Sequence, residues 1–138
     1  MRTPPRSRVP FRWPLAVGAL AVLSMLALAA CTTVPPAGAK PVAGFDVDRY
    51  AGHWYELARI DLRFEKGLIN TSAHYSRNPD GSLKVVNRGY DPVRKVWKQA
   101  EGKGLFIGQT SEAALKVSFF GPFYGGYNVV ALDPNYQW

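Results

Sequence analysis

Short β-prone runs separated by tight turns occupy most of the chain beyond its amino-terminal third. One run alternates cleanly, with Leu115, Val117 and Phe119 on one side and polar residues between them, as a half-buried strand does. Turn-forming residues at 78–81 and 91–92 close two other runs. Strands this short and this regularly spaced predict an all-β domain, an antiparallel meander arranged as a barrel or a sandwich.

We expect six strands and the beginning of a seventh, preceded by one helical turn at 46–50 that an aspartate caps. The strands are predicted at residues 54–60, 70–77, 83–90, 96–103, 115–119 and 127–133, with the seventh beginning at Gln137 and Trp138. Closing such a barrel takes eight strands. We therefore expect the chain to be a fragment or a truncated product, in which residues 31–138 alone aggregate or bind no lipid.

The period of two also assigns one face of each strand to the interior. This inner face mixes small, aromatic and a few polar residues, whereas a tightly filled core favours bulky aliphatic side chains. An eight-stranded barrel can hold one small ligand, with plain core packing as the alternative. The residues predicted to line the interior are Ala73, Tyr75, Val85, Asn87, Ala100, Leu115, Val117, Phe119, Tyr127 and Val129, with Phe64 and Leu68 at its lip.

The amino-terminal segment has the composition of a secretory signal peptide. Its first fourteen residues carry four arginines and no acid, and residues 15–30 are uncharged and apolar. This apolar stretch is shorter than the roughly 20 residues that a membrane-spanning helix needs. It ends in Leu-Ala-Ala-Cys at 28–31, which resembles the lipobox of bacterial lipoproteins. An uncleaved anchor with an incidental cysteine is the alternative.

The lipobox resemblance implies cleavage before Cys31, a diacylglyceryl group on its sulfur and acylation of the new terminal amine. More than one acyl chain makes membrane attachment effectively stable, since each buried methylene adds about 0.8 kcal/mol. Thr32 stands where an aspartate would retain a lipoprotein in the inner membrane, so the resemblance implies the outer membrane, with the domain facing the periplasm. We therefore expect a signal peptide over 1–30 and a proline-containing tether over 31–44.

The charge of the chain does not indicate a nucleic-acid partner. The formal net charge is +7, but four of the arginines lie in the expected signal peptide. The remainder has thirteen basic and ten acidic residues, a balance of +3 that is ordinary for a soluble domain. Cys31 is the only cysteine, so no intrachain disulfide can form.

Two short motifs resemble the signatures of the lipocalin family. Gly52 and Trp54, at the start of the meander, look like the first signature, and Asp133 and Tyr136, near its end, look like the second. The stretch 114–127 is more specific, and with the lipobox it closely resembles the bacterial outer-membrane lipocalins, relatives of apolipoprotein D.

This resemblance implies an up-and-down antiparallel barrel of eight strands, of which about six to seven are covered by residues 45–138, so that the domain is incomplete at its carboxyl end. The family's third signature, an arginine that packs over Trp54, has no counterpart in the sequence.

A search for catalytic and metal-binding groups finds little. His53 lies beside Trp54 and His74 is expected to project outward, so we do not expect these two histidines to share a metal site. The serines lack a neighbouring base, and the glycines lack the spacing of a phosphate cradle. Some lipocalin-fold proteins are enzymes, including a prostaglandin isomerase that uses a thiol in its barrel, but the thiol here is assigned to the anchor. We expect no enzyme activity, no cofactor and no metal.

Our leading hypothesis is a membrane-anchored binding protein that holds a fatty acid or a lysophospholipid-like amphiphile in its barrel. An apolar interior with sparse polar groups is the usual composition of a small-ligand site. By resemblance, the protein takes part in lipid storage or transport for envelope maintenance. Two alternatives stay open: an enzyme acting on an acyl or isoprenoid lipid, and a structural envelope lipoprotein whose barrel is filled.

Overall fold

The computed structural model describes residues 33–62 and 65–138, which belong to one compact unit of the chain. The expected signal peptide, the lipid-attachment residue Cys31 and the lip residue Phe64 lie outside the described residues. Within the described ranges, no helix is long and apolar enough to cross a membrane.

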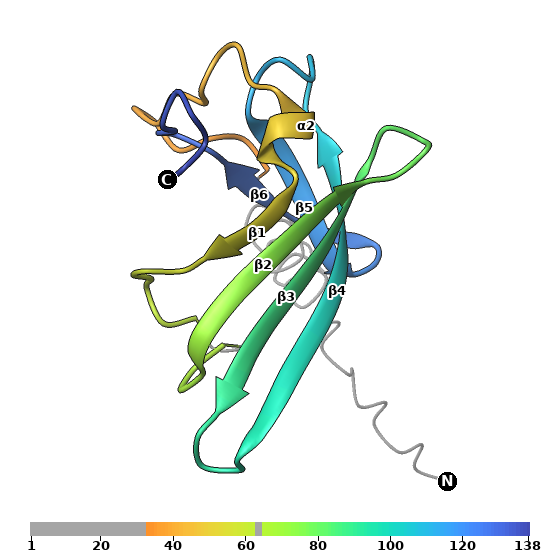
Figure 1. The fold of residues 1–138 in the computed structure, drawn as a ribbon. Coiled ribbons are helices and arrows are strands. Elements are labelled where there is room, and N and C mark those ends of the chain that lie inside the picture. The colour runs from red at the N-terminus through yellow and green to blue at the C-terminus, as the bar shows by residue number, and fades with distance from the viewer. Residues whose placement is uncertain (1–32, 63–64) are drawn as a thin grey trace, which may run out of the picture. The chain divides into compact units, whose positions relative to one another are not determined.

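Six strands form a single antiparallel sheet in which each strand pairs with the next along the chain (Figure 1). One short helix, α2 (Val47–Tyr50), precedes them. The strands are β1 (Gly52–Tyr55), β2 (Ile69–Arg77), β3 (Leu83–Asp91), β4 (Val96–Phe106), β5 (Ala114–Phe120) and β6 (Phe123–Asn128). The predicted all-β antiparallel meander is confirmed.

The helix α2 begins where Asp46 caps it. The Oδ1 atom of Asp46 accepts the backbone N–H groups of Asp48 at 2.9 Å and Arg49 at 3.3 Å. These bonds satisfy two of the N–H groups that the start of a helix leaves without a partner. Val47 and Tyr50 face the core and are buried, so the predicted helical turn at 46–50 is present.

Gly52 turns the chain from α2 into β1. Its φ of 124° lies in a region that residues with a Cβ rarely adopt. Two residues later, the half-buried Trp54 stacks on Tyr50 with ring centroids 4.7 Å apart, and its indole Nε1–H donates to the Tyr50 carbonyl at 2.8 Å. The bend at Gly52 therefore folds the tryptophan of the first motif against the helix.

The first predicted strand is too long. β1 ends at Tyr55 rather than at residue 60, because the following residues leave the sheet. The guanidinium of Arg59 donates to the backbone carbonyls of Glu65 at 3.2 Å and Leu68 at 2.6 Å. These bonds hold residues 56–62 in a loop tied to the start of β2, so they do not extend the ladder.

The predicted position of the sixth strand is also wrong. β6 begins at Phe123, whereas the sequence predicted residues 127–133. Phe120 pairs directly with Phe123, so the hairpin turn is confined to the two residues between them. Gly126 lies inside the strand, where a Cβ would meet the backbone oxygen of Thr33 at 3.1 Å. A glycine is needed here for close approach of two backbones.

Gln137 and Trp138 follow a turn at residues 134–136 and are not part of a strand. The Asp133 carboxylate accepts the N–H groups of Asn135 at 2.9 Å and Gln137 at 3.3 Å. The N–H of Asp133 also donates to the carbonyl of Trp138 at 2.8 Å. These bonds fold the last described residues back on Asp133 and occupy groups that a strand would use for pairing.

The apolar core lies near α2. Leu83 and Leu115 are fully buried there, and the ring of Phe45 lies 5.0 Å from that of Tyr50 and 6.2 Å from that of Phe106. Farther from the helix the packing stops, and residues 96–101 of β4 are exposed on both faces. The inner face of the sheet is therefore filled at the helix end, while its side chains are exposed toward the turn between β3 and β4.

Candidate ligand-binding site

Eight of the ten residues predicted to line the barrel meet in one apolar cluster. They come from β2, β3, β5 and β6 and the residue that follows β6, and the pairing of β5 with β6 places Leu115 opposite Tyr127. Three are buried and five are partly buried against them: Tyr75, Val85 and Leu115, then Ala73, Val117, Phe119, Tyr127 and Val129. The structure thus brings most of the predicted lining residues together.

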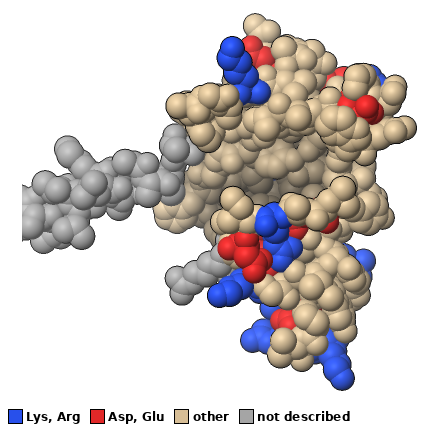
Figure 2. Space-filling model, turned by 90° about the vertical axis from the view of Figure 1, so that its left-hand side faces the viewer, with Lys and Arg blue, Asp and Glu red and all other residues tan. Residues whose placement is uncertain are grey.

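The remaining two predicted residues, Asn87 and Ala100, lie beyond the cluster. They are direct partners on β3 and β4, and Ala73 of β2 pairs with Asn87 on its other side. Ala100 is exposed, and the buried Oδ1 atom of Asn87 has no hydrogen-bond partner within the described residues. Buried polar atoms are normally paired, so this row of three residues, which begins with Ala73 at the edge of the cluster, borders the unfilled part of the inner face. Figure 2 shows that the described residues are hollowed between their two ends.

Three tyrosine hydroxyl groups meet in the filled part. The hydroxyl oxygens of Tyr50 and Tyr127 lie 2.6 Å apart, and the Tyr75 hydroxyl donates to that of Tyr127 at 3.0 Å. Burial, reinforced by the neighbouring phenols, raises the pKa of Tyr50 and of Tyr75 well above the usual range. Both side chains stay protonated at neutral pH, so they are hydrogen-bonding groups and not bases.

A loop held by Arg59 lies at the opposite end of the sheet. The guanidinium pairs with the carboxylates of Glu56 at 2.7 Å and Asp61 at 3.1 Å, and the Arg59 side chain is only 18% exposed. The Thr71 hydroxyl, on β2, donates to the same Glu56 carboxylate. Because Arg59 also bonds the Leu68 carbonyl, one side chain ties both ends of the loop to β2.

Leu68, predicted to lie at the lip, packs on β3. A Cβ added at Gly89 would meet the Leu68 side chain at 3.0 Å, so the glycine makes room for it. In the same loop Leu57 and Ile60 are 94% and 86% exposed. The open end of the inner face is therefore bordered by apolar side chains, some of them fully in solvent.

The two predicted motifs meet at the helix end. The Tyr136 hydroxyl accepts the N–H of Asp46 at 2.8 Å, and the Arg49 guanidinium carbon lies 4.3 Å from the Tyr136 ring centroid. The ring of Phe45 lies 6.4 Å from that of Tyr136 and 5.0 Å from that of Tyr50, which in turn stacks on Trp54. Residues far apart in the sequence thus close the same end of the structure.

The structure places His53 directly opposite His74, on the outer face of β1 and β2, with ring centroids 4.4 Å apart. Together with Arg88 and Trp97 they line a surface hollow of about 730 Å³. His74 projects outward as predicted, and its approach to His53 depends on the register between β1 and β2, which the face of each strand alone does not give. Within residues 33–62 and 65–138, no group of three or more metal-ligating side chains is present.

The family model of the lipocalin-like domain matches residues 45–138. This chain belongs to the lipocalin-like family. The match runs from Phe45, which packs on α2, through all six strands to Trp138. It includes both motifs and every residue predicted to line the interior.

Bacterial lipoproteins are among the relatives of this lipocalin. It is 54% identical over 119 residues to the outer membrane lipoprotein Blc of Escherichia coli (strain K12), which covers 86% of this chain and 67% of the relative. It is 52% identical over 123 residues to the Citrobacter freundii protein of the same name, with 89% and 70% covered. Apolipoprotein D of Oryctolagus cuniculus is 41% identical over 76 residues, 55% of this chain and 39% of the relative. The resemblance drawn from the motifs is confirmed.

A solved structure shares the fold of this lipocalin. The major allergen Per a 4 from cockroaches matches with a TM-score of 0.53 at 19% sequence identity, covering 75% of this chain and 59% of that one. At this identity the likeness concerns the fold alone. It agrees with the all-β architecture that the strand pattern predicts.

Proposed function

We propose that this lipocalin is a lipid-binding lipoprotein that holds a fatty acid or a lysophospholipid-like amphiphile on the inner face of its sheet. Lipidated Cys31 anchors it to the bacterial outer membrane, and the domain faces the periplasm. Its task is the storage or transport of lipids for envelope maintenance. The relatives named outer membrane lipoprotein, at 54% and 52% identity, support the anchor and the location.

The observation that carries the proposal is the unfilled row formed by Ala73, Asn87 and Ala100. Two of its members are small, and the third presents a buried carbonyl oxygen that has no hydrogen-bond partner among the residues the structure describes. A ligand seated here finds apolar surface together with one polar group that lacks a hydrogen bond. Few polar groups in an apolar surrounding are typical of sites for small amphiphiles.

The two ends of the inner face suit an amphiphile differently. At the helix end, Leu83 and Leu115 fill the space completely, so a ligand does not pass them. At the other end, the exposed side chains of Leu57 and Ile60 offer apolar contacts to an acyl chain on its way in. The ligand therefore enters from the loop end and stops at the core.

An enzymatic role has little support in the chemistry of the inner face. The polar side chains predicted to face inward are Tyr75, Asn87 and Tyr127. Tyr75 is held protonated by its raised pKa, and an amide is neither a base nor a nucleophile. A binding role needs no such group.

The test is a pair of tryptophan substitutions on β4. Ala100→Trp places a large side chain in the unfilled row, where the exposed alanine leaves room without overpacking. Gln99→Trp, one residue along and on the outer face, is the matched control. The full chain, purified in detergent and delipidated, is titrated with a fluorescent fatty acid, and product formation is followed in parallel.

The missing strands predict aggregation or no lipid binding by residues 31–138, but the six-stranded sheet already presents the inner face on which the proposal rests. We therefore expect saturable one-site binding without turnover, abolished by Ala100→Trp and kept by Gln99→Trp. Equal binding by both variants would contradict the inner-face site. Turnover of the lipid would support the enzyme, and the absence of binding by the unsubstituted chain would support a structural lipoprotein with a filled barrel.

A further inference from the structure

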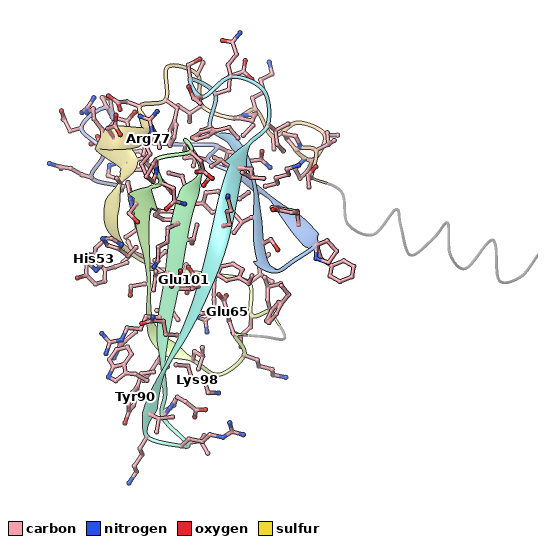
Figure 3. All side chains as sticks on the ribbon, turned by 90° about the vertical axis from the view of Figure 1, so that its right-hand side faces the viewer. His53, Glu65, Arg77, Tyr90, Lys98 and Glu101 are labelled. Carbon is pink, nitrogen blue, oxygen red and sulfur yellow. The ribbon has the colours of Figure 1, made fainter. Side chains whose placement is uncertain are left out.

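Two histidines face each other on the outer surface of the sheet. His53 of β1 and His74 of β2 are direct cross-strand partners, with ring centroids 4.4 Å apart and ring planes at 58°. Figure 3 shows His53 projecting from β1 to the outside of the sheet. His53 is exposed and His74 is half-buried, so the space between and above the rings is open to solvent.

Neither imidazole is used elsewhere in the described part of the chain. Among the described residues their one aromatic contact is with each other, and no side-chain hydrogen bond or ion pair to either is present within residues 33–62 and 65–138. Arg88 lines the same hollow, but its guanidinium carbon lies 4.4 Å from the centroid of the Trp97 ring, so this cation packs on the tryptophan. Both rings therefore keep a free nitrogen lone pair when they are neutral.

Opposed imidazoles at this spacing are suited to chelating one metal ion. Directly opposite residues of an antiparallel pair have Cβ atoms about 4.5–5.5 Å apart, and a metal–imidazole bond is about 2.0–2.1 Å long. A small ion between the rings can thus bind one nitrogen from each strand, with water in its remaining positions. Imidazole favours Cu²⁺, Ni²⁺ and Zn²⁺, of which Cu²⁺ binds tightest at a given set of ligands.

We propose that His53 and His74 form a two-imidazole site for a divalent transition-metal ion on the outer face of β1 and β2. The site is separate from the proposed lipid site, because Trp54 and Ala73, the adjacent residues, face the other side of the sheet. Occupancy clamps β1 to β2.

The test uses the full chain without a polyhistidine tag, in detergent, titrated with Cu²⁺ at neutral pH. Electron paramagnetic resonance counts the nitrogens bound to copper, and calorimetry gives the affinity. We expect one Cu²⁺ per chain with two imidazole nitrogens. His53→Thr and His74→Thr each leave one ligand and should weaken binding at least tenfold, while threonine, a good strand residue, preserves the fold.

A relocated histidine separates chelation from the mere presence of two imidazoles. The variant His53→Thr/Gln99→His keeps two histidines on the outer face, but on β2 and β4, two strands apart and offset by two residues along the strands, a separation of about 12 Å at the usual spacings. It should bind as weakly as His53→Thr alone. Unsubstituted chain that binds Cu²⁺ no more tightly than His53→Thr/His74→Thr, or that shows only one bound nitrogen, would overturn the proposal. Circular dichroism confirms that each variant is folded.

Discussion

The hydroxyl oxygens of Tyr50 and Tyr127 lie 2.6 Å apart and link α2 to β6 across the core. The hydroxyl of Tyr75 joins them by donating to Tyr127 at 3.0 Å, so Tyr127 is the shared partner of both buried phenols. A polar group buried in an apolar core destabilises the fold unless it is hydrogen-bonded. The three hydroxyl groups satisfy one another, which allows tyrosines where the core would otherwise need phenylalanines.

Tyr127→Phe should destabilise the chain more than Tyr50→Phe does. Removing the Tyr127 hydroxyl takes away the shared partner of two buried groups, at a cost of about 1–3 kcal/mol, whereas Tyr50→Phe removes one bond, at about 0.5–1.5 kcal/mol. Urea denaturation of the full chain, followed by tryptophan fluorescence, measures the difference. A Tyr127→Phe variant at least as stable as the unsubstituted chain would show that the cluster contributes nothing.

Alkaline pH should unfold this protein through the same tyrosines. The folded state raises the pKa of Tyr50 and Tyr75 above the ordinary value of 10.0, chiefly through burial. Above about pH 10 the unfolded chain loses these protons while the folded chain keeps them, so the free energy of unfolding falls as the pH rises. Below about pH 10 the contribution of these groups is constant.

The measurement is the urea midpoint between about pH 8 and pH 11. The variant Tyr50→Phe/Tyr75→Phe should lose part of the alkaline decline. Tyr55→Phe is the matched control, because Tyr55 is 76% exposed, and it should keep the whole decline. Identical declines in all three proteins would rule out a contribution from the buried phenols.

The fold is predictable from this sequence where a local rule decides. The turn at 78–81 forms as its residues indicate, with Asp80 Oδ1 accepting the N–H of Ser82 at 2.9 Å. Strand parity places Leu115 and Val85 in the core. Strand ends are not predictable in this way. β1 ends early because Arg59 donates to the carbonyls of Glu65 and Leu68, six and nine residues away. These bonds outweigh the β-propensity of residues 56–60.

The candidate site shows the same division. The period of two is enough to put Ala73, Asn87 and Ala100 on one face. It does not predict that the space beside them is left unfilled, because that depends on where the core ends. The approach of His53 to His74 depends on the register between β1 and β2, which makes these two residues direct partners. The sequence gives one indication of this approach, because the period of two places both histidines on the outer faces of their strands.

Cys31→Ser tests the anchor. The proposed lipidation requires the thiol of Cys31, so the variant should incorporate no labelled fatty acid and should remain an uncleaved precursor. Metabolic labelling followed by electrophoresis measures both. The control is Thr32→Ser, which leaves the cysteine in place and should be labelled and processed normally. If Cys31→Ser is labelled as strongly as the unsubstituted chain, the lipid is attached elsewhere. If neither protein is labelled, no lipid is attached.

Asn87→Leu should raise the stability of the ligand-free chain and weaken its lipid binding. A buried polar atom without a partner costs about 1–3 kcal/mol, and the small neighbours Ala73 and Ala100 leave room for leucine. Asn128 provides the control, since its Oδ1 atom is also buried and unpaired in the described structure. Asn128 follows the inward-facing Tyr127 on β6, so its own side chain faces the outer side of the sheet. Asn128→Leu should raise stability and leave fatty-acid affinity unchanged. Equal effects of the two variants on affinity would separate Asn87 from the ligand.

Arg59→Lys should loosen the loop at the open end without unfolding the core. Arg59 reaches the carboxylates of Glu56 and Asp61 and the carbonyls of Glu65 and Leu68 because its guanidinium carries several donors in a fixed plane. Lysine has the charge but not this planar fork, so it cannot make the same set of bonds. We expect amide hydrogen exchange in 56–62 and 65–68 to accelerate on the order of tenfold, by local opening, while exchange in β3 and β5 stays unchanged.

The same opening should speed the release of bound fatty acid, since the loop borders the end from which the proposed ligand enters. The control is Arg77→Lys, which alters an exposed pair with Asp48 at 3.2 Å, where both side chains are about half or more in solvent. Exposed pairs of this kind contribute little, so exchange and release should match those of the unsubstituted chain. If Arg59→Lys leaves loop exchange unchanged, the bonds of Arg59 do not hold the loop. If exchange rises but fatty-acid release does not, the loop is not the entrance.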